Sequence, residues 1–368
     1  MSEFLIRKYI QLNQIPVHAQ FAVTYRCNAR CIHCYYGDFL RKTSEFSLSE
    51  IMCLLKRLAK EGTLDIGFTG GEPFLRKDFL DIARYARKLG FLINIATNAS
   101  LITKYKAKEL SLLYPSLVRV SLYGGGREAY SKITGNPDLF IKTIRGLDFL
   151  IHHKVVTEVM IPVFNFYTMD DLLVMGKICS SLGVGYDFSF AFYPRLNRDL
   201  KPLEYLVSQA QLEKFLTKIP KCRGFFSGCD TKKINKQQVI CLSARNTIFL
   251  SPDGKVGNCF MVMAQSRIPR KSFMKQFLRV WRNDPLLQRH RESRWGERIQ
   301  CLGCDRLYQR YCIVRYCPGV ALLLTGELTG IHSYICEISA RICNAISKIN
   351  VTEKQITDVE PPCTNTIS

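Results

Sequence analysis

Three cysteines close to the N-terminus have the spacing of ligands for a metal centre. Cys27, Cys31 and Cys34 are separated by three and then two residues in the stretch CNARCIHCYY, which follows an apolar run. Three thiolates on one short loop can bind three irons of a cubane cluster and leave the fourth iron open to an exogenous ligand. For this string taken alone, half of a zinc site is the alternative interpretation.

A second set of cysteines lies in the C-terminal part of the chain. Two of them are separated by a glycine in a C-x12-G-x4-C arrangement, two more form a C-x2-C pair, and three follow at wider spacing. In chain order these residues are Cys241, Gly254, Cys259, Cys301, Cys304, Cys312, Cys317 and Cys336. Thiols at such density in a stretch with little continuous hydrophobic pattern indicate that metal centres stabilise it, with a zinc ribbon as the alternative.

The composition predicts a globular protein in a reducing compartment. The chain has 368 residues, of which 47% are hydrophobic and 11% aromatic, and it contains 16 cysteines. No apolar run approaches the roughly 18 residues that a membrane helix needs, and the N-terminus lacks a secretory segment. We therefore expect a cytoplasmic protein without a membrane partner, in which thiols bind metal instead of forming disulfides.

The formal net charge of +21 raises the question of a nucleic-acid partner. The lysines and arginines are scattered through many segments instead of gathering in one arm or helix, which favours a generally basic surface. An acidic peptide or cofactor is the partner favoured next. A zinc-stabilised nucleic-acid-binding protein remains the alternative from another functional class.

Strand and helix patterns alternate from about residue 17 to residue 215. The expected strands are HAQFAVT, LDIGFT, FLINIAT, LVRVSLY, VVTEVMIP and YDFSFAF, and several of the helices between them end at a glycine, as at Gly62, Gly90 and Gly183. Repeated strand-helix units imply parallel strands with right-handed crossovers. The pattern therefore predicts an α/β fold, a partial (β/α)6 barrel with its chemistry at the carboxyl ends of the strands.

The pattern changes after residue 215. A loop-rich stretch begins there, with one expected hairpin in NTIFLSPDGKVGNCF, where Pro252, Asp253 and Gly254 have turn chemistry. We expect four parts: an N-terminal segment over 1–16, the barrel over 17–215, a small metal-binding domain over 216–350, and a polar, flexible tail over 351–368.

Four motifs in this order resemble those of the radical S-adenosylmethionine (SAM) enzymes. TYRCNARCIHCYY is similar to their cluster loop, and TGGEP, TNA and SLYGGGREAYSKITG follow the second, third and fourth expected strands. The form of the last motif is typical of the peptide-modifying branch. The resemblance implies a [4Fe-4S] cluster bound by Cys27, Cys31 and Cys34, with SAM on the open iron.

The resemblance also implies which residues contact SAM. Gly70 and Gly71 would let the backbone approach the SAM ammonium, and Glu72 would supply its negative partner. Short polar side chains at strand ends would bind the ribose or methionyl part. The candidates for these further contacts are Asn98 and Ser121, with Arg195 facing the pocket from the linker and His33 placing its backbone near adenine.

The second cysteine set resembles the SPASM domain, which carries one or two auxiliary [4Fe-4S] clusters. One cluster would use Cys241, Cys259 and Cys317 with Cys229 or Cys222 as fourth ligand, and the other Cys301, Cys304, Cys312 and Cys336. The family spaces its ligands around the third cysteine of the later run by five and three residues. Here seven residues separate Cys304 from Cys312 and four separate Cys312 from Cys317, so loop insertions are needed to keep the pairing.

The resemblance implies a maturase that cleaves SAM reductively to a 5′-deoxyadenosyl radical and abstracts hydrogen from a residue of a ribosomally made peptide. An oxidative cross-link is the expected product. Epimerisation is the alternative, with Cys343, Cys363 or Cys222 as candidate hydrogen donors, and so is action on a tetrapyrrole or a sugar. Cys53 and Cys179, inside helical patterns, are expected to be buried small hydrophobes.

The implied partners are a peptide, possibly acidic, an electron donor such as flavodoxin or ferredoxin, and a separate leader-recognition protein. Only 26 residues precede Cys27, which is too few for a leader-binding domain of their own.

Overall fold

The computed structural model describes residues 3–37, 44–222, 237–241, 243–298 and 316–348. Its centre is one sheet in the order β6-β5-β4-β3-β2-β1-β7-β8. All neighbouring pairs are parallel except β7 and β8. The strands are β1 (His18–Thr24), β2 (Asp65–Gly70), β3 (Leu92–Thr97), β4 (Leu117–Ser121), β5 (Thr157–Pro162), β6 (Gly185–Ser189), β7 (Thr247–Leu250) and β8 (Val256–Gly257).

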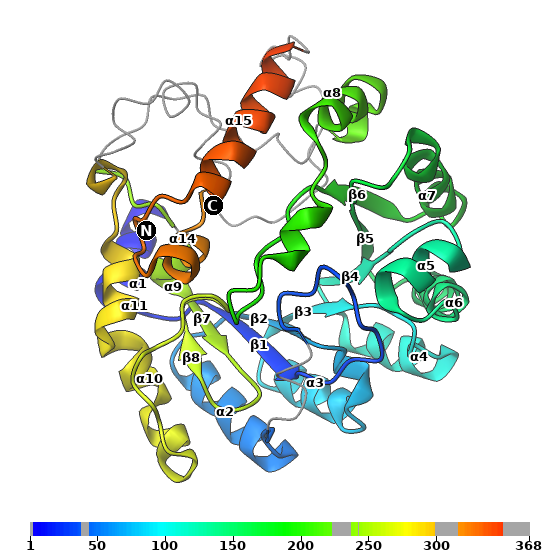
Figure 1. The fold of residues 1–368 in the computed structure, drawn as a ribbon. Helices are drawn as coiled ribbons and strands as arrows, with labels where there is room; N and C mark the ends of the chain where they lie inside the picture. Colours follow the sequence, from blue (N-terminus) through cyan, green and yellow to red (C-terminus); the bar gives the residue numbers. More distant parts are fainter. Residues whose placement is uncertain (1–2, 38–43, 223–236, 242, 299–315, 349–368) are drawn as a thin grey trace.

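Helices alternate with the first six strands, as the sequence predicts. Figure 1 shows α2 to α7 around the outside of the curved, unclosed sheet, and α15 beside α8. The α-helices are α1 (Glu3–Leu12), α2 (Leu48–Lys60), α3 (Phe79–Lys88), α4 (Lys104–Leu113), α5 (Arg127–Thr134), α6 (Leu139–His152), α7 (Met169–Ser181), α8 (Gln209–Lys218), α9 (Ser243–Asn246), α10 (Phe273–Asn283), α11 (Pro285–Glu292), α14 (Pro318–Thr325) and α15 (Ser333–Lys348). Short 3-10 helices are η1 (Pro73–Leu75), η2 (Lys201–Tyr205), η4 (Arg270–Ser272) and η5 (Trp295–Glu297). The predicted partial (β/α)6 barrel is confirmed.

Alternation along each strand separates the core from the functional face. In β4, Val118 and Val120 are fully buried, whereas Arg119 is exposed and Ser121 lines a cavity. Since side chains alternate between the two faces of a strand, Arg119 and Ser121 share the inner face of the barrel. Burial of each valine contributes about 1.5–3 kcal/mol, so the outer face holds the helices while the inner face stays free for chemistry.

Local signals fix the ends of several elements. Ser47 caps α2 with a reciprocal bond to Glu50, and Thr168 caps α7 in the same way with Asp171. The glycines that follow α2, α3 and α7 have positive φ angles of 88°, 92° and 67°, as expected for the residue after a helix.

The predicted hairpin is confirmed, but its place in the fold was not foreseen. β7 and β8 pair antiparallel through Phe249 with Gly257 and Leu250 with Val256. In addition, β7 pairs parallel to β1, so the sheet continues across the expected boundary at residue 215. The segment after that boundary thus completes the edge of the barrel, while the division into domains stays a prediction.

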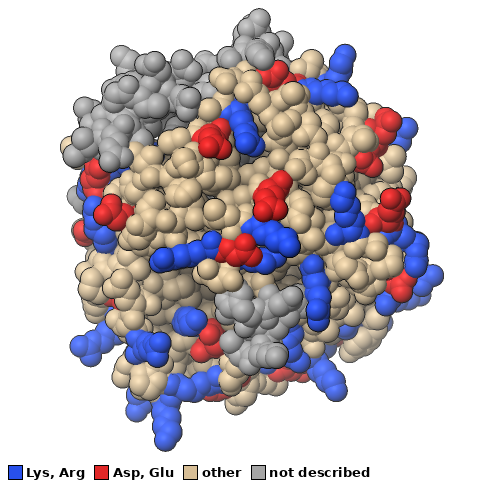
Figure 2. Space-filling model, in the orientation of Figure 1, with Lys and Arg blue, Asp and Glu red and all other residues tan. Residues whose placement is uncertain are grey.

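The charges on the face shown in Figure 2 are dispersed. Lysines and arginines alternate there with aspartates and glutamates. Among the described residues, no helix is both long and apolar enough to cross a membrane.

Candidate functional site

The three N-terminal cysteines lie directly after β1 and line one cavity of about 250 Å³. We call it the N-terminal cavity. It is lined by Tyr25, Cys27, Ala29, Cys31, His33, Cys34, Tyr35, Tyr36, Gly37, Thr69, Gly70, Gly71, Ala96, Thr97, Asn98, Ser121 and Tyr123. The carboxyl ends of β1, β2, β3 and β4 therefore meet at this cavity, as predicted for a parallel barrel.

The arrangement of the thiols fits a cluster. Within the described parts of the chain, no three Cys, His, Asp or Glu side chains converge closely enough for a single metal ion. Cys27, Cys31 and Cys34 instead surround a volume, and the ligands of a cubane also surround a volume because they bind irons at different corners.

A buried polar network holds the start of the cysteine loop. The Glu45 carboxylate accepts a 2.6 Å hydrogen bond from Thr24 Oγ1 and a 3.0 Å bond from the Tyr25 amide. Arg76, which is also buried, donates to the carbonyls of Val23 and Phe46. These bonds fix the direction in which the chain leaves β1. The sequence analysis missed both residues, because neither stands in a recognisable motif.

Gly70 and Gly71 line the cavity, and packing against the cysteine loop requires both. Gly71 donates a 2.7 Å hydrogen bond to the Thr24 carbonyl, and Gly70 has a φ of 129°. A Cβ atom on Gly70 would overlap the Thr24 carbonyl, and one on Gly71 would overlap the Arg26 carbonyl. The pair therefore brings the end of β2 against the loop, a role additional to the predicted approach to SAM.

Glu72 is bound by donors of its own chain. It is fully buried and is not among the residues that line the N-terminal cavity. Its Oε1 accepts from the Phe74 amide at 3.1 Å and from Thr97 Oγ1 at 2.8 Å, and its Oε2 accepts from the Asn98 amide at 2.7 Å. The carboxylate thus faces the end of β3, and its contact with the SAM ammonium stays a prediction. Burial raises the pKa of Glu72, and these three donors oppose that shift.

Asn98 lies at the cavity with its side chain already oriented. Its Nδ2 donates to Asn28 Oδ1 at 2.9 Å, and its Oδ1 accepts from Ser100 Oγ at 2.6 Å. Asn28 in turn donates to Ser100 Oγ at 2.8 Å, which closes a network between the cysteine loop and the TNA turn. Ser121 lines the same cavity from β4. Asn28 and Ser100 carry no sequence signal that separates them from ordinary loop residues.

His33 lies within an aromatic cluster. Its ring centroid is 5.5 Å from Tyr123, 5.1 Å from Phe164 and 5.3 Å from Phe192. Complete burial lowers the pKa of His33 to about 4, so the imidazole is neutral near pH 7. This packing agrees with a positional role.

Arg195 is not placed at the N-terminal cavity. Its Nη1 lies 2.7 Å from the carboxylate of Asp199, and it is absent from the cavity lining. The neighbouring Leu196 amide donates to the Tyr35 carbonyl at 2.9 Å, so the linker contacts the cysteine loop through Leu196. A contact between Arg195 and SAM stays a prediction.

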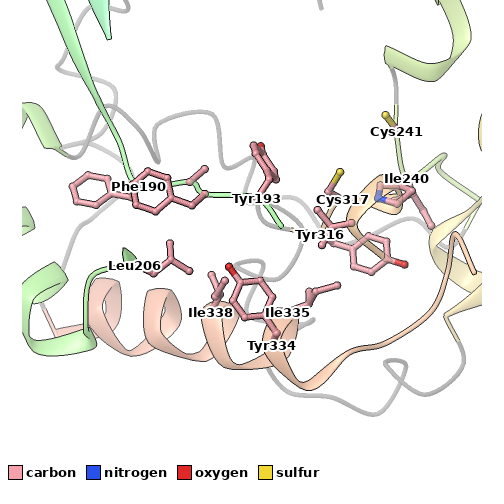
Figure 3. A pocket seen from close by; sticks show the side chains of 14 residues that line it. Phe190, Tyr193, Leu206, Ile240, Cys241, Tyr316, Cys317, Tyr334, Ile335 and Ile338 are labelled. Atoms are coloured by element: carbon pink, nitrogen blue, oxygen red, sulfur yellow. The ribbon is translucent and has the colours of Figure 1, made fainter. Parts of the chain in front are cut away.

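A second cavity of about 250 Å³ contains two cysteines of the C-terminal set (Figure 3). We call it the auxiliary cavity. Cys241 and Cys317 lie at one end, beside Ile240 and Tyr316, while Phe190, Leu206 and Ile338 lie at the other. The remaining lining residues are Ala191, Phe192, Tyr193, Pro318, Val320, Tyr334 and Ile335.

Cys259 completes a group of three thiols there. Burial raises the pKa of Cys259 to about 12, and the nearby thiols of Cys317 and Cys241 contribute to the shift. Cys259 and Cys317 also pack around one apolar cluster with Met261 and Trp295. The structure therefore brings together three of the ligands expected for the first auxiliary cluster.

Cys222 does not lie with this group. It is fully buried, and burial alone raises its pKa to about 12, with no contribution from the other three thiols. Its neighbour is Tyr186 of β6, whose pKa is raised by burial and by the thiols of Cys179 and Cys222. Cys222 thus packs in the core beside Tyr186, and its roles as a fourth ligand or a hydrogen donor stay predictions.

The remaining cysteines differ in exposure, and five of them lie outside the described residues. Cys336 lies in α15 and is half-buried, and Cys179 is buried as predicted. Cys53 is exposed on α2, which corrects the expectation that it is buried, because its position faces away from the stripe that packs on the sheet. Cys343 lies in α15. Four expected ligands and one candidate donor lie outside the described residues: Cys229, Cys301, Cys304, Cys312 and Cys363.

A surface hollow of about 220 Å³ adjoins the auxiliary cavity. The two share Leu206, Tyr334 and Ile338, and the hollow continues along Leu200, Leu203, Glu204, Glu337 and Arg341. Leu206, Tyr334 and Ile338 therefore border both the hollow and the auxiliary cavity, between the linker and α15.

Comparison with known sequences identifies the first part of the chain. Residues 21–177 match the model of the Radical SAM superfamily. Over 126 residues the chain is 40% identical to the Fe-coproporphyrin III synthase of Methanosarcina barkeri, a match that covers 34% of this chain and 31% of that protein. It is 26% identical over 253 residues to a probable GTP 3′,8-cyclase of Saccharolobus solfataricus, covering 65% of this chain and 81% of that protein.

A further relative is the antilisterial bacteriocin subtilosin biosynthesis protein AlbA of Bacillus subtilis. The two are 28% identical over 162 residues, which are 43% of this chain and 36% of AlbA. The chain thus spans about a third of the length of AlbA and of the coproporphyrin synthase.

Among solved structures, SuiB of Streptococcus suis has the same fold over most of the chain. Bound to SAM, it superposes with a TM-score of 0.69 at 15% identity, over 90% of this chain and 80% of SuiB. Bound to its precursor peptide SuiA, it gives a TM-score of 0.68 at 18% identity, over 90% and 78%.

Proposed function

Since the chain carries a radical SAM domain and is an enzyme of that kind, we propose that it modifies a ribosomally made peptide and forms an oxidative cross-link within it. Radical SAM domains use a [4Fe-4S] cluster and SAM, which together supply a 5′-deoxyadenosyl radical that abstracts hydrogen from a substrate. The protein contributes the binding, the orientation and the exclusion of water.

Five lining residues of the N-terminal cavity and the nearby Glu72 have definite tasks in this proposal. Cys27, Cys31 and Cys34 hold the cluster. Asn98 and Ser121 offer hydrogen-bonding side chains to the ligand from the ends of β3 and β4. Glu72 binds the Asn98 amide, so it keeps the ligand-binding turn in place before SAM arrives.

The observation that carries the peptide proposal is the pair of adjoining cavities beside α15. The surface hollow and the auxiliary cavity share Leu206, Tyr334 and Ile338, and Leu200 and Leu203 add further apolar lining to the hollow. An extended peptide suits adjoining apolar cavities, because its side chains can enter them one at a time while its backbone stays near the surface.

The described residues that line these cavities carry too little positive charge to favour an anionic small molecule as substrate. Among the described lining residues of the two cavities and the hollow, the only lysine or arginine is Arg341, which lies 3.9 Å from the Glu337 carboxylate. A nucleoside triphosphate or a tetrapyrrole with several carboxylates would need more cationic partners than these. The relatives that are GTP cyclase and coproporphyrin synthase nevertheless make such a substrate the second candidate.

We further propose two auxiliary [4Fe-4S] clusters. Cys241, Cys259 and Cys317 would hold the first, with Cys229 as fourth ligand because Cys222 lies in the core. The second would use Cys301, Cys304, Cys312 and Cys336. The proposed partners are a low-potential electron donor such as flavodoxin or ferredoxin and a leader-recognition protein, and the proposed location is the cytoplasm.

Substrate competition tests this proposal. The anaerobically reconstituted enzyme is given SAM, reductant and a synthetic precursor peptide encoded by a short reading frame beside its gene, or instead Fe-coproporphyrin III or GTP. Of the three substrates, only the peptide should raise the rate of 5′-deoxyadenosine formation above the rate without substrate. Only the peptide should also change in mass. A response to Fe-coproporphyrin III or GTP alone would replace the peptide proposal with the second candidate.

A further inference from the structure

Tyr35 lies between the two groups of thiols. It follows Cys34 in the sequence and lines the N-terminal cavity together with the three cysteines of the loop. On its other side, its ring stacks on Phe260, with centroids 4.2 Å apart and planes at 29°. Phe260 follows Cys259, a member of the auxiliary group. One pair of stacked rings thus connects the residues next to both cysteine sets.

The ring of Tyr35 is also held firmly. Its carbonyl accepts the 2.9 Å bond from the Leu196 amide, and its ring centroid is 4.5 Å from Tyr36. Phe260 packs edge-on against Tyr193, which lines the auxiliary cavity, at 6.1 Å. Tyr35 therefore packs between Tyr36 and Phe260, and Phe260 in turn packs against a residue that lines the auxiliary cavity.

We propose that the stacked rings of Tyr35 and Phe260 form the path by which an electron passes between the N-terminal cluster and the first auxiliary cluster. The inference rests on the cluster sites of the proposed function but not on the nature of the substrate. With both clusters bound, one electron would leave the reduced cluster and the other cluster would accept it, so that the oxidation and the reduction would balance. Tyr35 is a positioning residue in this transfer and is itself neither oxidised nor reduced.

The test measures electron transfer without any substrate. The reconstituted holoenzyme is mixed with less low-potential reductant than its clusters can accept, frozen at successive times, and examined by electron paramagnetic resonance to follow how the electron distributes among the clusters. In Tyr35→Leu, where a void replaces part of the packed path, redistribution should slow by roughly tenfold or more. Tyr35→Phe keeps the ring and should redistribute at the wild-type rate.

Phe192→Leu is the matched control. Phe192 is a second aromatic residue between the cavities, in contact with His33, and its removal leaves the stack of Tyr35 on Phe260 unchanged. It should not slow the redistribution. A wild-type rate in Tyr35→Leu, or equal slowing in Phe192→Leu, would overturn the proposal.

Phe260→Leu decides the question if Tyr35→Leu binds less iron. This variant removes the ring of the stack that lies next to Cys259. Slower redistribution of the electron in Phe260→Leu supports the proposed path, and redistribution at the wild-type rate refutes the path. Because no peptide is present, a wrong substrate assignment cannot produce either result.

Discussion

The Oε2 atom of Glu72 accepts a 2.7 Å hydrogen bond from the backbone amide of Asn98, which joins the turn after β2 to the turn after β3. Both turns border the N-terminal cavity, and the carboxylate is fully buried between them. A buried carboxyl group needs hydrogen-bond partners, and here two backbone amides and one hydroxyl donate to it.

Glu72→Gln should weaken SAM binding indirectly. The side-chain NH2 group of glutamine would face one of the three groups that now donate hydrogen bonds to Glu72. Because two donors would then meet without an acceptor, the free energy of unfolding should fall by about 1–3 kcal/mol. Thermal unfolding and calorimetric titration with SAM would measure both effects, with iron content unchanged. Glu109→Gln, which alters an ion pair with Arg84 at the surface, is the control. Equal stability of the two variants would contradict the role assigned to Glu72.

Replacement of Cys27, Cys31 and Cys34 by alanine should remove one cubane and all SAM cleavage. The loss should be about four of about twelve irons per chain, because the C-terminal thiols do not share ligands with this loop. Iron analysis and assay of 5′-deoxyadenosine would measure it. Cys53→Ala, at an exposed thiol on α2, should retain all iron. SAM cleavage by the triple variant would refute the assignment of the loop.

Cys259→Ser and Cys222→Ser should separate a ligand from a core residue. The first should lose about four irons, since Cys259 lies with Cys241 and Cys317, and the second should lose none. Iron content and the electron paramagnetic resonance of the reduced protein would be compared. Loss of a cluster from Cys222→Ser at unchanged stability would restore Cys222 as the fourth ligand.

The sequence predicted the elements of the barrel well because its signals are local. Strand-helix alternation, the glycines after helices and the motifs at strand ends all describe a residue and its near neighbours. The pairing of β7 with β1 was missed because a short apolar run indicates burial and not its partner. Spacing likewise could not show that Cys222 lies in the core, nor that Glu72 faces β3, since both depend on packing between segments far apart in the chain.

His290 should make stability dependent on pH. Burial, and secondarily Arg291, lowers its pKa from 6.5 to about 4. Above pH 6.5, the pKa of the unfolded chain, His290 is neutral in both the folded and the unfolded state. In that range its titration does not lower the free energy of unfolding. As the pH falls from 6.5 toward 4, only the unfolded chain takes up a proton, so the free energy of unfolding falls by at most about 3 kcal/mol.

Thermal unfolding between neutral and mildly acidic pH would test this dependence. His290→Leu should flatten the curve relative to the wild type in that range, whereas His152→Leu, at an exposed position of α6, should not. An unchanged slope in His290→Leu would show that other groups dominate the acid dependence.

The last prediction concerns the product. Auxiliary clusters are useful where an electron must leave the substrate after hydrogen abstraction, and Tyr35 and Phe260 join the two thiol groups that would exchange it. We therefore expect net oxidation, so that the peptide product is lighter by two hydrogens and deuterium at the target carbon appears in 5′-deoxyadenosine. Mass spectrometry of peptide and nucleoside would measure both.

Epimerisation is the outcome that this measurement must separate from oxidation. It ends when a thiol returns a hydrogen to the substrate, and of the three candidate donors Cys222 is buried in the core. Cys343 and Cys363 stay candidates. Epimerisation would leave the mass unchanged in ordinary water and raise it by one unit per modified site in deuterated water. A mass-neutral product that carries solvent deuterium would therefore refute net oxidation, while the radical SAM domain and its cluster loop would be unaffected by that result.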